Sequence, residues 1–290
     1  MDWTPEGKTA IVTGANTGIG KEIAQELAAR GAHVVIASRN REKCEAAARD
    51  IQARTGKETV DVMTVDLASF ASVRAFASEY LGSNRPLHIL VNNAGGTWSQ
   101  RRPTDDGHET TFQVNHLGPF LLTNLLLPRL KESAPARIVT TSSTGHNFSR
   151  GLDFDDLDRE KRRYKSMQAY SDSKLCNIYF TSELARRLEG TSVTAYSFHP
   201  GFVRTEFAQG GDTFLLSIGT KLGSPFARSP KKGAETGVFL AATPDLDGVN
   251  GDYFFNCKPK RTSTVAKDDA AARKLWEVSE HMVGLSGDRA

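Results

Sequence analysis

Short apolar runs alternate with longer segments of helical periodicity along this chain. Three of the runs, Ala10–Val12, Val34–Ala37 and Ile89–Val91, are apolar at every position and do not alternate with polar residues. Strands of this kind are buried on both faces, which is typical of a parallel sheet. The longer segments between them have the length and pattern of helices that cover such a sheet.

The order of these segments predicts one α/β fold. Strands that alternate with helices form right-handed βαβ units, and a series of such units builds a doubly wound parallel sheet, the Rossmann fold. No repeat, low-complexity tract or Pro/Gly linker divides the chain, so we expect a single domain over 1–290. The expected strands cover 9–13, 33–38, 60–65, 89–92, 137–142, 192–198 and 252–255, and the expected helices cover 18–30, 41–55, 69–81, 107–131, a segment carrying Tyr170 that ends near 188, 230–242 and 268–283.

Composition and charge exclude several classes of protein. The 290 residues include 37 basic and 34 acidic side chains, a net charge of +3 that gives no argument for nucleic-acid binding. Three widely spaced cysteines form no CxxC or Cys/His cluster, so neither a disulfide framework nor a metal site is predicted. No signal peptide and no transmembrane run is apparent. We therefore expect a cytoplasmic protein.

A glycine-rich loop joins the first expected strand to the first expected helix. Its sequence, Thr13-Gly14-Ala15-Asn16-Thr17-Gly18-Ile19-Gly20, has the spacing Gly-x3-Gly-x-Gly. Glycines let the backbone approach a pyrophosphate closely, and the helix N-terminus offers free N–H groups to the anion. The position of the loop within a βαβ unit predicts dinucleotide binding, with contacts from Gly14, Asn16, Thr17, Gly18, Ile19 and Gly20.

The end of the second strand indicates which dinucleotide binds. An acidic residue there would accept hydrogen bonds from a ribose 2′-hydroxyl, whereas an arginine would pair with a 2′-phosphate. The strand ends Ala37-Ser38-Arg39-Asn40-Arg41 and carries no acid. Arg39 is therefore the candidate for the 2′-phosphate, and NADP(H) is favoured over NAD(H). The alternative is that Arg39 and Arg41 are ordinary surface charges.

Tyr170 and Lys174 stand four residues apart, which places them on one face of a helix. A free phenol has a pKa near ~10 and is a poor base at neutral pH. An adjacent ammonium stabilises the phenolate, so we expect Lys174 to lower the pKa of Tyr170 and the pair to transfer a proton. Taken alone, the two residues could equally lie on a solvated helix face.

Together with Asn92-Asn93-Ala94-Gly95, these motifs resemble the short-chain dehydrogenase/reductase family over nearly the whole length. The glycine loop continued by Lys21-Glu22, Val114-Asn115-His116-Leu117-Gly118, and the tail from Gly251-Asp252-Tyr253-Phe254 to Arg273-Lys274-Leu275-Trp276-Glu277-Val278 are similar to its retinol-dehydrogenase-like branch.

The resemblance implies a role for each residue in a family position. Ser143 would hydrogen-bond the substrate oxygen, Tyr170 would be the general acid/base, Lys174 would also hold the nicotinamide ribose, and Asn115 would steady a proton-relay water. Taken singly, Ser143 could be only a strand-end serine and Asn115 could only join strand ends. The implied cofactor contacts, besides Tyr170 and Lys174, are Asp66, Leu67, Asn93, Ala94, Gly95, Pro200, Val203 and Thr205.

Three positions depart from the family pattern. Ser143 and Tyr170 lie farther apart than in short members, and the stretch 152–157 resembles an insertion of the branch. Pro119 stands where many members of the branch have a histidine. Asp172 lies inside the Tyr/Lys motif, where other residues are common. The N-terminal membrane anchor of some members is not expected here.

The expected activity is reversible hydride transfer between NADP(H) and a lipophilic, retinal-like aldehyde, ketone or alcohol. A substrate lid is expected at about 205–228, although this stretch could equally pack on the core or in an oligomer contact. A homodimer or homotetramer is a family expectation. The alternatives are an NADP(H)-binding sensor without turnover and a light-dependent tetrapyrrole reductase. The apolar residues of the lid are Phe207, Phe214, Leu215, Leu216, Ile218, Leu222 and Phe226.

Overall fold

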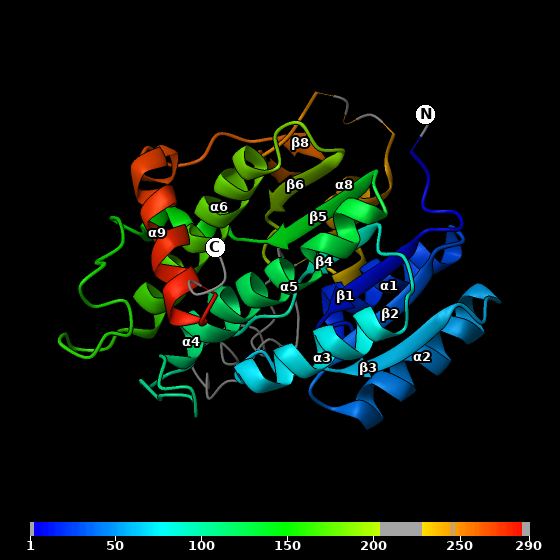
Figure 1. The fold of residues 1–290 in the computed structure, drawn as a ribbon, viewed down its shortest axis with the longest axis horizontal. Helices are drawn as coiled ribbons and strands as arrows, with labels where there is room; N and C mark the ends of the chain where they lie inside the picture. Colours follow the sequence, from blue (N-terminus) through cyan, green and yellow to red (C-terminus); the bar gives the residue numbers. More distant parts are fainter. Residues whose placement is uncertain (1–2, 204–227, 245, 247, 286–290) are drawn as a thin grey trace.

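The fold is built on one eight-stranded sheet with the strand order β3-β2-β1-β4-β5-β6-β7-β8 (Figure 1). The computed structural model describes residues 3–203, 228–244, 246 and 248–285. All strand pairs are parallel except the last, β7 with β8. The strands are β1 Thr9–Thr13, β2 His33–Ser38, β3 Val60–Thr64, β4 Ile89–Asn92, β5 Ala136–Thr141, β6 Val193–Phe198, β7 Tyr253–Phe255 and β8 Lys258–Pro259.

Helices cover both faces of the sheet, which confirms the doubly wound fold. The middle of β1 is apolar at every position because both faces of the strand are buried. Ile11 packs in one hydrophobic core, while Ala10 and Val12 pack in the other. Helices α3, α5, α6 and α9 cover the first core, and α1, α2 and α8 cover the second. The helices are α1 Gly18–Ala29, α2 Arg41–Thr55, α3 Phe70–Gly82, α4 Thr110–Phe112, α5 Gly118–Glu132, α6 Ser166–Arg187, α8 Pro230–Ala242 and α9 Asp269–Met282.

The long helix expected over 107–131 is divided into three parts. α4 is a single turn, a π-helical turn η1 covers Gln113–Leu117, and α5 begins at Gly118. Pro119 lies at the start of α5, directly after η1. The division matters because η1 carries Asn115, and π turns inside helices often mark functional sites.

Two short 3-10 helices and β8 were not predicted. Their bounds are η2 Thr144–Phe148 and η3 Val265–Lys267. Elements of two to five residues are too short to produce a periodic pattern. η2 follows β5 directly and begins the connection between Ser143 and α6.

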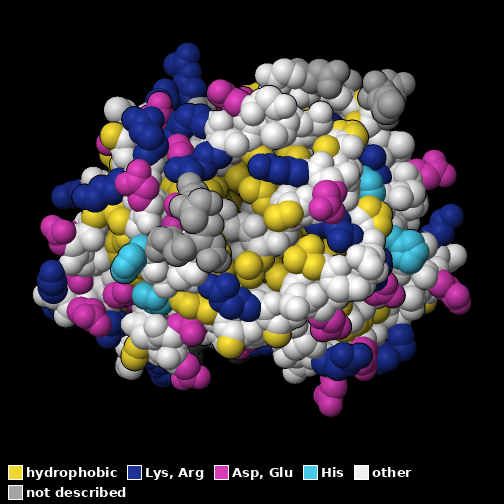
Figure 2. All heavy atoms as spheres, in the orientation of Figure 1, with side chains coloured by type: hydrophobic (Ala, Val, Ile, Leu, Met, Phe, Trp, Pro, Cys, Tyr) yellow, Lys and Arg dark blue, Asp and Glu magenta, His cyan; other side chains and the backbone are white. Residues whose placement is uncertain are grey.

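The amphipathic helix α9 packs against α5 and α6 on the outside of the first core (Figure 1). Trp276 of α9 is buried, with its ring stacked on Phe180 and perpendicular to Phe120. Figure 2 shows the molecule from the same side as Figure 1. Charged side chains surround the face in this view, and hydrophobic side chains gather near its middle. Among the described helices, none has the length and hydropathy needed to cross a membrane.

Candidate active site

The glycine-rich loop leaves no room for side chains at two positions. A Cβ atom on Gly14 would lie 2.9 Å from Cα of Ala94, and Gly14 also has a positive φ of 67°. A Cβ on Gly20 would lie 2.6 Å from the carbonyl oxygen of Gly14 and would collide with the Asn93 amide. The loop therefore closes tightly between β1 and α1 only because these residues are glycines.

The loop is fastened to the end of β4 by Thr13. Its hydroxyl accepts from the backbone N–H groups of Asn93 at 3.0 Å and Ala94 at 3.1 Å. The Asn93 side-chain amide donates to the carbonyl of Thr13 at 3.0 Å. β1 and β4 are neighbours at which the strand order reverses, and in doubly wound sheets this crevice binds the ligand.

The N-terminus of α1 faces this crevice without a side-chain cap. Thr17 is the exposed N-cap residue, but its side chain accepts no hydrogen bond from the first turn. The N–H groups of the first turn are therefore left available to an anion, as a bound pyrophosphate requires. Gly18 opens the helix, and half-buried Asn16 lies in the loop before it.

Arg39 is exposed at the end of β2, directly before Asn40, the N-cap of α2. It has no hydrogen bond or ion pair with the residues that the structure describes, whereas neighbouring Arg41 pairs with Glu45 at 2.9 Å. At the end of the next strand, Asp66 accepts from the N–H of Ala68 at 3.0 Å, so its carboxylate shapes the turn before α3. Leu67 is buried against Gly118 at the start of α5.

Ser143 and Tyr170 meet across the junction between η2 and α6. Ser143 is the N-cap of η2, and its hydroxyl accepts from the N–H of Gly145 at 3.0 Å. The Ser143 side chain also forms a hydrogen bond with Tyr170. A Cβ on Gly145 would lie 3.1 Å from the Tyr170 ring and 3.3 Å from Oγ of Ser143. The absence of a side chain at Gly145 therefore lets these two groups approach each other.

Lys174 lies one turn after Tyr170 and is 3% exposed. Its Nζ donates to the carbonyl of Thr141 at 3.2 Å and lies 5.6 Å from the centre of the Tyr170 ring. The carbonyl of Lys174 accepts from Oγ of Ser142 at 2.8 Å. The Tyr/Lys pair is therefore not on a solvated helix face, because α6 presents it to the carboxyl end of β5.

Asn115 is fully buried in η1, and its side chain forms hydrogen bonds with two different segments. Its side chain bonds both the N–H of Gly96, at 2.8 Å, and the carbonyl of Gly96, at 2.9 Å. Its amide also donates to Oγ of Ser173 at 2.9 Å. A Cβ on Gly95 would lie 2.9 Å from the Asn115 oxygen and 3.5 Å from Nζ of Lys174. The four predicted catalytic residues thus lie in one cluster.

The segment after β6 approaches the glycine loop from the other side. Val203 and Ile19 both lie against Gly233 of α8, where a Cβ would be 2.6 Å from Val203 and 3.3 Å from Ile19. Pro200 is half-buried at the end of β6. Thr205 and the expected lid, apart from Arg228, lie outside the described residues.

The pKa values differ from the expectation that Lys174 lowers the pKa of Tyr170. Burial raises the pKa of the Tyr170 phenol above 10, and the hydrogen bond with Ser143 acts against this rise without overcoming it. Burial also lowers the pKa of Lys174 from 10.5 to about 8. In the protein alone the pKa of Tyr170 is therefore raised where a lowering was expected, because desolvation of the phenol outweighs its hydrogen bond with Ser143.

Three residues of the cluster were not singled out from the sequence. Ser173 holds Asn115, Gly145 lets the Tyr170 ring approach Ser143, and Ser142 bonds the backbone of α6. Ser173 could have been found from its position inside the Tyr/Lys motif, whereas the other two contacts depend on the path of η2. Within the described residues, no His/Cys/Asp/Glu group is arranged to hold a metal ion.

Comparisons with known proteins agree with this geometry. The sequence model of the short chain dehydrogenase family matches residues 8–152. Retinol dehydrogenase 12 from Mus musculus is 49% identical over 96% of this chain and 87% of its own length. Retinol dehydrogenase 13 from Homo sapiens is 46% identical over 97% of this chain and 86% of its own.

Solved structures share the fold over most of the chain. An uncharacterized protein from Mycobacterium Paratuberculosis is 35% identical with a TM-score of 0.78, covering 98% of both chains. RhlG of Pseudomonas aeruginosa, in an NADP active-site complex, is 27% identical with a TM-score of 0.68, covering 87% of this chain and 96% of its own.

The chain therefore belongs to the short-chain dehydrogenase/reductase family, whose members are oxidoreductases that use a nicotinamide cofactor. Within the family it falls in the retinol-dehydrogenase-like branch, as its identity to two retinol dehydrogenases over nearly the full chain establishes. It is an oxidoreductase acting on an alcohol or carbonyl group.

Proposed function

We propose that this protein uses NADP(H) to interconvert a lipophilic aldehyde or ketone and the corresponding alcohol. The observation that carries the proposal is the cluster of half-buried Ser143 and Tyr170 with buried Lys174, beside a loop that accepts only glycine at Gly14 and Gly20. This arrangement supports a proton-transfer pair next to a dinucleotide crevice. No observation favours a sensor without turnover or a tetrapyrrole reductase.

The cofactor fits the shape and charge of the crevice. A side chain on Gly14 or Gly20 would fill the space that a pyrophosphate approaches, and the first turn of α1 has no side-chain cap. Exposed Arg39, free of partners among the described residues, supports a 2′-phosphate and hence NADP(H). The NADP complex of the related RhlG is consistent with this choice.

The chain's own residues handle the substrate oxygen and its proton. When bound, the dinucleotide would supply or accept the hydride. Ser143 and Tyr170 would donate hydrogen bonds to the carbonyl oxygen, and Tyr170 would give it a proton in the reductive direction. Lys174, with a pKa of about 8, carries a positive charge below that pH and would stabilise the phenolate left on Tyr170. Asn115 would hold the proton path open beside Lys174.

Exposed apolar residues in the segments that carry the site residues support a lipophilic substrate. Phe148 is 71% exposed, Met167 52% and Phe202 54%. Each belongs to a segment that also carries a site residue: Phe148 ends η2 after Ser143, Met167 precedes Tyr170 by three positions, and Phe202 follows Pro200. Large apolar side chains left in water next to a polar site are suited to binding an apolar molecule.

The reaction is tested with a panel of retinal, long-chain aldehydes, ketosteroids and quinones, supplied with NADPH or NADH. We expect NADPH consumption with apolar aldehydes or ketones. Tyr170→Phe should lower kcat by about 10²–10⁴-fold, the usual contribution of general acid catalysis. NADPH binding without turnover of any carbonyl or alcohol would refute the proposal in favour of a sensor.

Two matched variants test whether Arg39 makes the protein prefer NADPH over NADH. Arg39→Ala removes a charged hydrogen-bond donor worth about 1.5–3 kcal/mol, and the lower end applies because Arg39 is exposed. We expect KM for NADPH to rise about tenfold while KM for NADH is unchanged. Arg41→Ala, which breaks only a helix ion pair with Glu45, should change neither KM. Equal effects of the two variants, or an effect on both cofactors, would contradict the assignment.

A further inference from the structure

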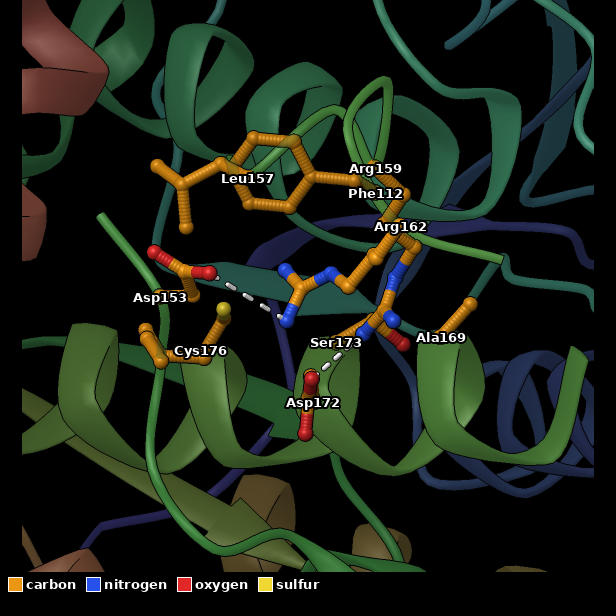
Figure 3. A pocket seen from close by; sticks show the side chains of 10 residues that line it. Phe112, Asp153, Leu157, Arg159, Arg162, Ala169, Asp172, Ser173 and Cys176 are labelled. Atoms are coloured by element: carbon orange, nitrogen blue, oxygen red, sulfur yellow. Dashed lines mark hydrogen bonds and ion pairs between the residues drawn. The ribbon is translucent and has the colours of Figure 1, made fainter. Parts of the chain in front are cut away.

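Asp172, inside the Tyr/Lys motif, is bonded by residues from two other parts of the chain. It lies in α6, two residues after Tyr170, and is 7% exposed. Its Oδ1 accepts from Oγ of Ser149 at 2.5 Å and from Nε2 of Gln168 at 2.8 Å. Its Oδ2 accepts from Nη2 of Arg159 (Figure 3). This carboxylate is therefore fully engaged, yet it takes no part in the proton transfer described above.

Ser149 connects Asp172 to the segment that carries Ser143. η2 covers Thr144–Phe148, with Ser143 as its N-cap and Ser149 as its C-cap. At the first end, Oγ of Ser142 donates to the backbone of α6 at the carbonyl of Lys174, at 2.8 Å. At the second end, Ser149 donates to Asp172. η2 is thus attached to α6 at both ends, and the Ser143–Tyr170 contact lies between the two attachments.

Arg159 holds the carboxylate from the opposite side. Its side chain is 4% exposed and its backbone has a positive φ of 54°, an uncommon conformation for a residue other than glycine. The guanidinium also donates to the carbonyl of Gln168 at 3.2 Å, so it contacts α6 at two points. A buried carboxylate needs such a partner to remain charged. Figure 3 shows Arg159 and Arg162 entering this junction above α6.

The junction is a structural connection and not a ligand site. The cavity beside Asp172 has a volume of about 10 Å³, lined by Phe112 and Cys176 among others. That is about the volume of one water probe and too small for a substrate. Its position, between the inserted stretch after η2 and the catalytic helix, instead indicates how the two are held together.

We propose that Asp172, held by Arg159, is a positioning residue that fixes Ser143 against Tyr170 through its hydrogen bond with Ser149. The inference rests on the proposed function, in which both hydroxyls bind one substrate oxygen. The stretch between Ser143 and Tyr170 would then help to position the two hydroxyls, in addition to connecting them along the chain. Small displacements of catalytic groups reduce rates strongly, by as much as about 10²-fold for 1 Å.

The test removes the hydroxyl that joins Asp172 to η2 and then restores it. Ser149→Ala leaves the Arg159–Asp172 ion pair in place, so the variant should fold where an Asp172 variant could fail. We expect kcat for carbonyl reduction to fall about 10–100-fold with KM for NADPH unchanged, and Ser149→Thr to recover most of the rate. Hydrogen exchange of the backbone amides in 144–148 should become faster in Ser149→Ala.

Glu183→Gln is the matched control on the same helix. Glu183 is also a buried carboxylate, which accepts from Arg186 at 2.9 Å and Arg187 at 2.7 Å, three turns beyond Asp172. This variant should lower the melting temperature without lowering kcat or changing exchange in 144–148.

Three results would overturn the inference: an unchanged kcat in Ser149→Ala, a loss that Ser149→Thr does not recover, or unchanged exchange in 144–148. If the wild-type protein turns over no carbonyl or alcohol, the proposed function fails. The exchange experiment still decides whether Ser149 and Asp172 hold η2 in place.

Discussion

Burial of Lys174 should make the folding free energy depend on pH in a definite direction. The side chain is 3% exposed, and its single hydrogen bond in the described residues goes to the carbonyl of Thr141. Desolvation lowers its pKa from 10.5 to about 8. Keeping the ammonium at the site therefore costs folding free energy, which we expect to recover by replacing it with an apolar side chain.

The size and sign follow from proton linkage. Between pH 8 and 10.5 the unfolded chain holds a proton on Lys174 that the folded protein has released, so stability rises with pH across this window. Below pH 8 both states are protonated and the penalty is complete. A shift from 10.5 to about 8 corresponds to about 3 kcal/mol at 1.36 kcal/mol per pKa unit.

The measurement is urea unfolding of the cofactor-free wild type and of Lys174→Met between pH 7 and 10. We expect Lys174→Met to be the more stable protein at pH 7, with an advantage that shrinks by about 2–3 kcal/mol as the pH approaches 10. The lost hydrogen bond to Thr141 adds an offset that does not change with pH. Turnover should be lost in this variant, because the phenolate of Tyr170 loses its cation.

Lys232→Met is the matched control, since that lysine is 56% exposed and its charge stays in water on folding. Its stability difference from the wild type should stay nearly constant over the same range. A constant difference for Lys174→Met as well would refute the reasoning, because it would mean that folding does not desolvate the Lys174 ammonium.

Three further substitutions probe other parts of the fold. Gly20→Ala should abolish NADPH binding, measured by cofactor fluorescence, because its methyl group would collide with the loop. Gly145→Ala should lower kcat without weakening NADPH binding, since its methyl group would lie 3.1 Å from the Tyr170 ring. Trp276→Ala should lower the unfolding free energy by about 3–5 kcal/mol, because it empties a buried site against Phe180.

The cofactor side of the site could be predicted from the sequence because it depends on local patterns. An uninterrupted apolar strand, a glycine loop and a helix start follow one another over residues 9–20, and the structure places them with the expected bounds. Gly14 and Gly20 were identified by spacing alone, and the close approach of Asn93 and Ala94 explains why glycine is required there. The roles of these residues in cofactor binding remain predictions.

For the catalytic side, the sequence predicted which residues belong to the site but not their environment. The family positions named Ser143, Tyr170, Lys174 and Asn115, and the structure brings all four together. The direction predicted for the Tyr170 pKa shift was wrong, because a sequence does not reveal how much water surrounds a side chain. The Arg159–Asp172 ion pair was missed for a related reason: Arg159 lies in the irregular stretch before α6 and Asp172 lies within α6, so no single periodicity relates the two residues.

One turn of α6 holds the proposed catalytic groups together. Three consecutive residues of this turn each bond a different segment: Asp172 bonds Ser149, Ser173 bonds Asn115, and the backbone of Lys174 bonds Ser142. Groups fixed on a helix keep their geometry better than groups carried by loops. Ser143 and Asn115, which lie on short irregular elements, therefore take their positions from the helix that carries Tyr170. On this view the residues between Tyr170 and Lys174 are as much a part of the site as the pair itself, because they set the distances over which the pair acts.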